Sequence, residues 1–65
     1  MSFEVGDVIV YYPVEMRDIH GNDPVKGKVE NIMGPDSIFN QQMLVLDTLD
    51  CWIPAYECKH EIEVN

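Results

Sequence analysis

Hydrophobic positions in this chain fall in short runs separated by glycine and proline, with no long amphipathic stretch. The first run, "VIVYY" at residues 8–12, is rich in β-branched and aromatic side chains, follows Gly6-Asp7 and ends at Pro13. This composition and punctuation predict a β-strand. Successive side chains of a strand point to opposite faces, and both faces of this one are apolar, so we expect both to be at least partly covered.

The central part of the chain predicts a long loop and two more strands. Residues 13–23, "PVEMRDIHGND", are polar and lead into a turn, which predicts a loop. Strand character returns in "VKGKVENIM" at residues 25–33, where Gly27 indicates a bulge or a close backbone approach. "QQMLVLD" at residues 41–47 alternates in the same way and predicts a third strand.

The C-terminal part predicts two short strands joined by one helical turn. "CWIP" at residues 51–54 is edge-like because Pro54 cannot donate a ladder hydrogen bond. "PAYE" at residues 54–57 fits a helical turn, since proline is tolerated at the first helical position. Alternation in "HEIEV" at residues 60–64 predicts the last strand.

Five short strands with a helical turn before the last predict an all-β fold, a small antiparallel barrel. A chain of 65 residues has room for one small core, so we expect a single domain over residues 1–65. The core residues that we expect are Val8, Val10, Val29, Leu44, Leu46, Ile53 and Ile62.

Composition supports a folded, water-exposed domain. The chain is 46% hydrophobic and 25% charged, which is too apolar for an intrinsically disordered segment. No apolar run approaches the roughly 20 residues that a membrane helix needs. The N-terminus "MSFEVGD" has neither the basic nor the apolar region of a signal peptide. We therefore expect a cytoplasmic protein that does not bind membranes.

Charge is the most distinctive bulk property. Twelve acidic and four basic residues give a formal net charge of −8. Nucleic-acid affinity comes mainly from lysine and arginine on phosphates, so direct DNA or RNA binding is disfavoured. Two interpretations of the acidity stay open. It keeps a small domain soluble, or it forms an acidic face that docks on a basic protein surface or mimics nucleic acid.

The segment "DCWIPAYECKH" gathers the only tryptophan, both cysteines and one of the two histidines. Cys51 and Cys58 are spaced C-x6-C and His60 follows as C-x-H, unlike the C-x2–4-C knuckles of structural zinc sites. A fourth ligand would have to be His20 or a carboxylate. We therefore expect no metal and no other cofactor.

Catalysis is not indicated either. Cys58 is flanked by Glu57, and an acidic chain is a poor setting for a reactive thiolate. The sequence contains no nucleophile–base–acid order, no glycine-rich phosphate loop and no H-E-x-x-H pair. We expect a protein without catalytic residues that is not an enzyme. A disulfide between the two cysteines is conceivable in so small a domain, but the absence of a signal-peptide pattern argues against it.

Four aromatic residues are candidates for contact with a partner, because the domain is too small to bury them all. Trp52 and Ile53 point to opposite strand faces, so an inward Ile53 places Trp52 outward, as a contact residue or as a lid. The candidate partner-binding residues are Trp52, Tyr56, Tyr11 and Tyr12.

Three segments, in order, resemble a known pattern: "FEVGDVIVYYP", "GKVENI" and "MLVLDTLDCWIPA". They are similar to F-x-V-G-D-x-V-V-Y-P, G-x-V-x-x-I, and Y-L-V-L followed by V-P-A-E. These are motifs of the RNA-polymerase-interacting domain of CarD-like regulators and transcription-repair coupling factors. The resemblance implies a Tudor-like barrel of the SH3-like class that binds a protein, with an exposed strand edge as one route. Residues 13–24 depart from the family as a longer insertion. The resemblance covers the docking barrel alone, so we expect no counterpart of the family's DNA-binding helical domain.

Two functions follow as expectations. The first is a non-enzymatic protein-binding module that docks on transcription machinery, with RNA polymerase as the partner implied by the resemblance, or on another large host assembly. The alternative is an acidic mimic of nucleic acid that inhibits a DNA- or RNA-binding protein. Compact acidic modules are also common among the phage proteins that take over host machinery.

Overall fold

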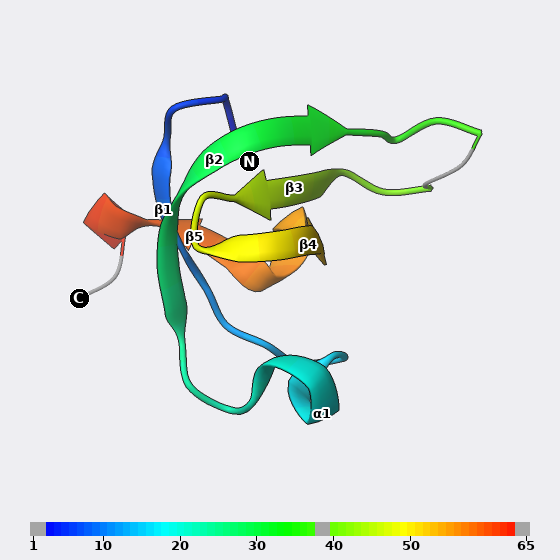
Figure 1. Ribbon diagram of the computed structural model, residues 1–65. Helices are drawn as coiled ribbons and strands as arrows, with labels where there is room; N and C mark the ends of the chain where they lie inside the picture. Colours follow the sequence, from blue (N-terminus) through cyan, green and yellow to red (C-terminus); the bar gives the residue numbers. More distant parts are fainter. Residues whose placement is uncertain (1–2, 38–39, 64–65) are drawn as a thin grey trace.

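The computed structural model describes residues 3–37 and 40–63, which form a mostly β structure (Figure 1). Five antiparallel strands make one sheet in the order β4-β3-β2-β1-β5. Among the described residues no pairing joins β4 to β5, so the sheet is not closed. The elements are β1 (Val8–Tyr11), α1 (Arg17–His20), β2 (Val25–Met33), β3 (Met43–Leu46), β4 (Leu49–Pro54), the 3-10 helix η1 (Ala55–Glu57), β5 (Cys58–His60) and the 3-10 helix η2 (Glu61–Glu63).

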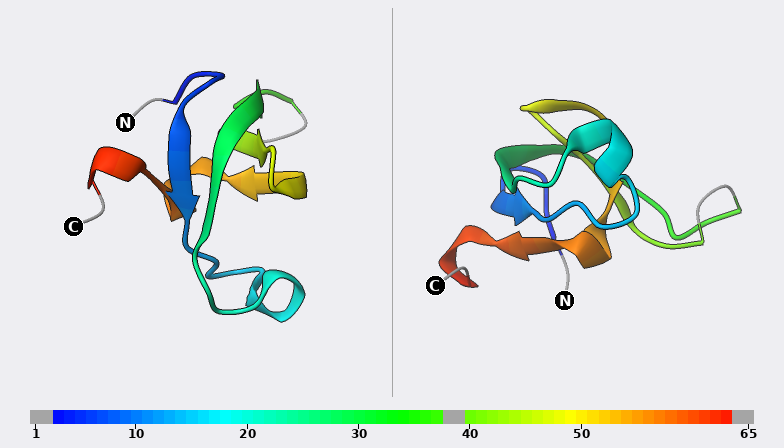
Figure 2. Two further views of the ribbon diagram at one scale, coloured as in Figure 1. Left: turned by 60° about the vertical axis from the view of Figure 1, so that its left-hand side comes forward. Right: turned by 90° about the horizontal axis from the view of Figure 1, so that it is seen from below.

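The long strand β2 connects the two halves of the sheet. Its first part pairs with β1, from Val25 opposite Tyr11 to Lys28 opposite Val8. Its second part pairs with β3, and the register shifts between Val29 and Asn31. Such a bulge bends a strand and increases its twist. As a result β3 and β4 run across the direction of β1, and the sheet curls around the core (Figures 1 and 2).

Strand β2 matches the predicted bounds, and Gly27 lies at the predicted close approach. A Cβ atom there would lie 2.5 Å from Thr48 Oγ1 and 3.1 Å from Leu46 Cβ. Thr48 donates a 2.9 Å hydrogen bond to the Lys26 carbonyl, and Asp47 Oδ1 accepts one of 2.9 Å from a neighbouring backbone N–H of β2. The β3–β4 turn is therefore packed onto β2 at a site that only glycine fits.

The core contains four of the seven expected residues. Six side chains are at most 1% exposed, and three more are nearly buried. The prediction is confirmed for Val29, Leu44, Leu46 and Ile53. Phe3, Ile9, Tyr11, Ala55 and Cys58 complete the core.

The prediction that Val8 and Val10 of β1 face the core was wrong. Ile9 and Tyr11 are fully buried, whereas Val8 and Val10 are only half-buried. Both faces of this strand are apolar, so alternation does not distinguish them. The face that carries the larger side chains faces the core, where it removes more apolar area from water.

The last strand is also corrected. It covers Cys58–His60 and pairs with β1 from Tyr11 to Ile9, beyond which the chain turns into η2. Ile62 lies in η2 and is 87% exposed, so it is not a core residue. An ion pair between Lys26 and Glu61 holds the start of η2 against β2. Position 64 of the predicted strand lies outside the described residues.

The helices are short. The predicted turn at 54–57 is confirmed as η1, while the predicted loop at 13–23 contains the one-turn helix α1. In the described part of the chain, no helix is long and apolar enough to cross a membrane.

Candidate partner-binding surface

Tyr56 is the outward-facing residue of η1. Pro54 precedes the helix with extended backbone, and its ring favours the start of a helical turn. Ala55 and Glu57 turn inward and are buried, whereas Tyr56 is 59% exposed. Because η1 is joined directly to β5, this exposed ring is carried on a short, well-anchored segment.

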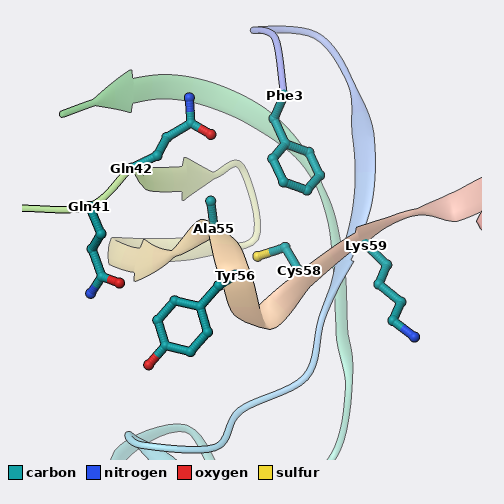
Figure 3. Close-up of a pocket in the computed structure, with 7 residues that line it drawn as sticks. All are labelled: Phe3, Gln41, Gln42, Ala55, Tyr56, Cys58 and Lys59. Atoms are coloured by element: carbon teal, nitrogen blue, oxygen red, sulfur yellow. The ribbon is translucent and has the colours of Figure 1, made fainter. Parts of the chain in front are cut away.

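Two open hollows flank Tyr56. One has a volume of about 440 Å³ and is drawn in Figure 3; the other has about 320 Å³. Tyr56 and Lys59 line both, so the tyrosine forms a ridge between them. The larger hollow is completed by Phe3, Gln41, Gln42, Ala55 and Cys58, and the smaller one by Tyr12, Val14 and Glu57. We call these residues together the Tyr56 surface.

The side chain of Glu57 fixes the loop that follows β1 against η1. Its Oε1 accepts a 2.9 Å hydrogen bond from the Val14 N–H, and Oε2 accepts a longer one of 3.5 Å from the Glu15 N–H. The Glu57 carbonyl also accepts a 2.9 Å hydrogen bond from the Tyr12 N–H. Both walls of the smaller hollow are thereby held in one arrangement.

The Tyr56 phenol is held in the same way. A hydrogen bond to the Glu15 carboxylate is the main cause that raises the pKa of Tyr56, and a hydrogen bond to Glu57 adds to it. The phenol therefore stays protonated at neutral pH, and the Glu15 carboxylate is the main acceptor of its one proton. A tyrosine with a restricted ring loses little entropy when a partner covers it.

The other predicted contact residues lie in different places. Tyr12 is half-buried and lines the smaller hollow. Tyr11 is fully buried in the core, where desolvation is the main cause that raises its pKa to about 12, and so it does not belong to the exposed surface. Trp52 is half-buried on β4, next to the fully buried Ile53 as expected, and lines neither hollow. Only Tyr56 and Tyr12 are brought together.

The two cysteines have different partners and form no disulfide. Cys51 Sγ lies 3.3 Å from His20 Nε2, whereas the buried Cys58 Sγ donates a 3.5 Å hydrogen bond to the Pro54 carbonyl. Desolvation is the main cause that raises the pKa of both thiols, for Cys58 to about 12. Both thiols therefore stay protonated at neutral pH.

His60 belongs to a third group. Its Nε2 lies 3.1 Å from Asp7 Oδ2, and its ring lies against that of Phe3 with centroids 4.6 Å apart. Cys51, Cys58 and His60 thus have separate neighbours. Within residues 3–37 and 40–63, no group of three or more histidine, cysteine or acidic side chains is arranged to hold a metal ion.

Sequence patterns did not indicate Glu57, Val14 or Lys59 as parts of this surface. Glu57 and Val14 are 43 residues apart, and no local periodicity links them. The only hint was that Glu57 and Lys59 lie close to the predicted aromatic contact Tyr56.

Comparison of the chain with protein-family models, curated proteins and solved structures gives no match.

Proposed function

We propose that this chain is a non-enzymatic protein-binding module of the SH3-like (Tudor-like) class that docks on the transcription machinery through the Tyr56 surface. The architecture is supported by the strand order, in which β1 lies between β2 and β5, and by the 3-10 turn that joins β4 to β5. RNA polymerase is the partner that the motif resemblance favours.

The observation that carries the proposal is the exposure of Tyr56 between two hollows. The residue is 59% exposed, and its hydroxyl has a hydrogen bond to the Glu15 carboxylate. Rigid tyrosines next to hollows are typical of the residues that dominate binding energy in protein interfaces.

Charge suggests which surface of a partner this domain approaches. A net charge of −8 repels phosphates and attracts basic protein surfaces. Complementary charge increases the rate of association and selects the partner, while the aromatic contact supplies affinity.

Binding to purified bacterial RNA polymerase, measured by biolayer interferometry, tests the proposal. We expect wild type to bind and Tyr56→Ala to weaken the affinity by about tenfold or more. Ile62→Ala is the matched control, because Ile62 is exposed but lines neither hollow, and we expect it to bind like wild type. A wild-type protein that does not bind the polymerase would contradict the proposal.

The alternative, an acidic mimic of nucleic acid, is distinguished by its salt dependence. Affinity carried by charge falls steeply as salt screens it. A mimic would therefore lose binding at high salt and be little affected by Tyr56→Ala. The proposed module retains a salt-resistant part of its affinity that depends on Tyr56.

A further inference from the structure

The larger hollow of the Tyr56 surface has an apolar floor (Figure 3). Its floor consists of Phe3, Ala55 and Cys58, which are all nearly buried, and the exposed Tyr56 forms one side. The Cys58 thiol stays protonated at neutral pH, because desolvation is the main cause that raises its pKa to about 12. The floor therefore has no charge and suits an apolar or aromatic group.

The polar groups that line this hollow are one lysine and two amides. Lys59 is the only charged residue of the lining, whereas the smaller hollow also contains Glu57. Lys59 forms no ion pair with a described residue. The amides belong to Gln41 and Gln42, which lie on the side of the hollow opposite Lys59 in the view of Figure 3. Of the two hollows, the larger one is thus complementary in charge to an anion.

The walls of the hollow are held in place within the domain. The Ala55 N–H donates a 3.0 Å hydrogen bond to the Gln42 carbonyl, which fixes the segment before β3 against η1. The Phe3 ring lies against the ring of His60 on β5, with centroids 4.6 Å apart. The hollow is therefore formed before a ligand arrives, and its volume of about 440 Å³ is typical of small-molecule sites.

We propose that the larger hollow binds a small organic molecule that has one carboxylate on an apolar or aromatic body. The carboxylate pairs with the Lys59 ammonium, and the body lies on the floor against the Tyr56 ring. The two glutamine amides can bond to a polar group at the far end of the molecule. An apolar lining with a few polar groups around it is the usual composition of such sites. This inference goes beyond the proposed function, because the ligand is not a part of the polymerase.

Amide NMR with three small probes tests the inference. The first, 3-phenylpropanoate, has both the carboxylate and the ring. Its matched control 3-phenylpropanamide has the same shape without the charge, and acetate has the charge without the ring. We expect 3-phenylpropanoate to shift the amide signals of Ala55, Cys58 and Lys59. It should bind about threefold to fivefold more tightly than the amide, as expected for one partly exposed ion pair. Equal affinity for 3-phenylpropanoate and either control, or shifts confined to Tyr12 and Val14 of the smaller hollow, would overturn the inference.

Charge variants locate the carboxylate. Lys59→Gln should reduce the affinity for 3-phenylpropanoate to that for its amide, and it should leave the affinity for the amide unchanged. Lys28→Gln removes the same charge from an exposed position on β2 that lines neither hollow, and it should change neither affinity. An equal loss in the two variants would show that net charge alone is responsible and would contradict the site.

A segment of a protein is the competing occupant of the hollow. The peptide acetyl-Ala-Phe-Glu-Ala-amide has the ring and the carboxylate on neighbouring residues, and we expect it to bind more weakly than 3-phenylpropanoate. Tighter binding of the peptide would overturn the assignment to a small molecule.

These titrations contain no polymerase, so the two proposals fail separately. Selective binding of 3-phenylpropanoate by a protein that does not bind polymerase would overturn only the proposed function. Polymerase binding through Tyr56 without selectivity for the carboxylate would overturn only this inference.

Discussion

The buried carboxylate of Glu57 accepts a 2.9 Å hydrogen bond from the backbone N–H of Val14, 43 residues earlier in the chain. This contact joins η1 to the loop after β1 and sets the width of the smaller hollow. The same carboxylate also has a hydrogen bond to the Tyr56 phenol. Stability and the shape of the proposed binding surface therefore depend on one side chain.

Glu57→Ala should lower the free energy of unfolding by about 1–3 kcal/mol, because two backbone N–H groups lose their acceptor. Urea unfolding followed by the fluorescence of Trp52 measures this change. Glu30→Ala, at an exposed position on β2, is the control and should change stability by less than about 0.5 kcal/mol. If the two variants were equally stable, the Glu57 contact would have no structural role.

Gly27→Ala should destabilise the fold by about 1–3 kcal/mol through overpacking, since the new methyl group would lie 2.5 Å from Thr48 Oγ1. The double variant Gly27→Ala with Thr48→Ala should recover part of the loss, because the closest atom is then absent. Recovery would be incomplete, since Leu46 Cβ is also only 3.1 Å away. Thermal unfolding of the single and double variants measures this, and an unchanged Tm in Gly27→Ala would show that the turn is loosely packed.

Asp7 should contribute a stabilisation that acid removes. A hydrogen bond from the Glu4 backbone N–H, and then one from His60, lower the pKa of Asp7 below its ordinary value of 3.8. A folded pKa below the unfolded one gives stability that is present above the unfolded pKa and lost as pH falls through the folded pKa. The stability difference between wild type and Asp7→Asn should therefore shrink as the pH falls below about 4. Urea unfolding at several pH values tests this, and a difference that acid does not reduce would contradict the assignment.

The thiols should react slowly and in a fixed order. Desolvation is the main cause that raises the pKa of Cys58 to about 12, and it also raises that of Cys51, which is more exposed. Iodoacetamide at neutral pH should therefore modify Cys51 first and Cys58 only after unfolding. Mass spectrometry of the Cys51→Ser and Cys58→Ser variants distinguishes the two sites. Labelling of Cys58 as fast in the folded protein as in urea would show that it is not buried.

Sequence patterns predicted the strands and turns that glycine and proline delimit. They did not predict which face of a strand is buried, because long-range contacts decide that. The strand 25–33 and the turn 54–57 are punctuated locally, and both are confirmed. Ile9 and Val10 are adjacent apolar residues on opposite faces, so the alternation of apolar and polar positions does not show which one is buried. Ile62 alternates with glutamates as in a strand, but the pairing of β5 with β1 ends at His60.

The Tyr56 surface was predictable only in part. An excess of aromatic residues indicated Tyr56 and Tyr12, but it could not distinguish Tyr12 from its neighbour Tyr11, which the strand turns into the core. The role of Glu57 was not visible, because its partner Val14 lies in a loop that the fold brings close.

The central claim, that the Tyr56 surface contacts the partner, is tested most directly by photo-cross-linking to purified bacterial RNA polymerase. The photoreactive residue p-benzoylphenylalanine takes the place of Tyr56 in one protein and of Ile62 in another, both exposed in the free protein. The account predicts a cross-link to polymerase from position 56 and none from position 62. Binding without a cross-link at position 56, or equal cross-linking from both positions, would contradict it.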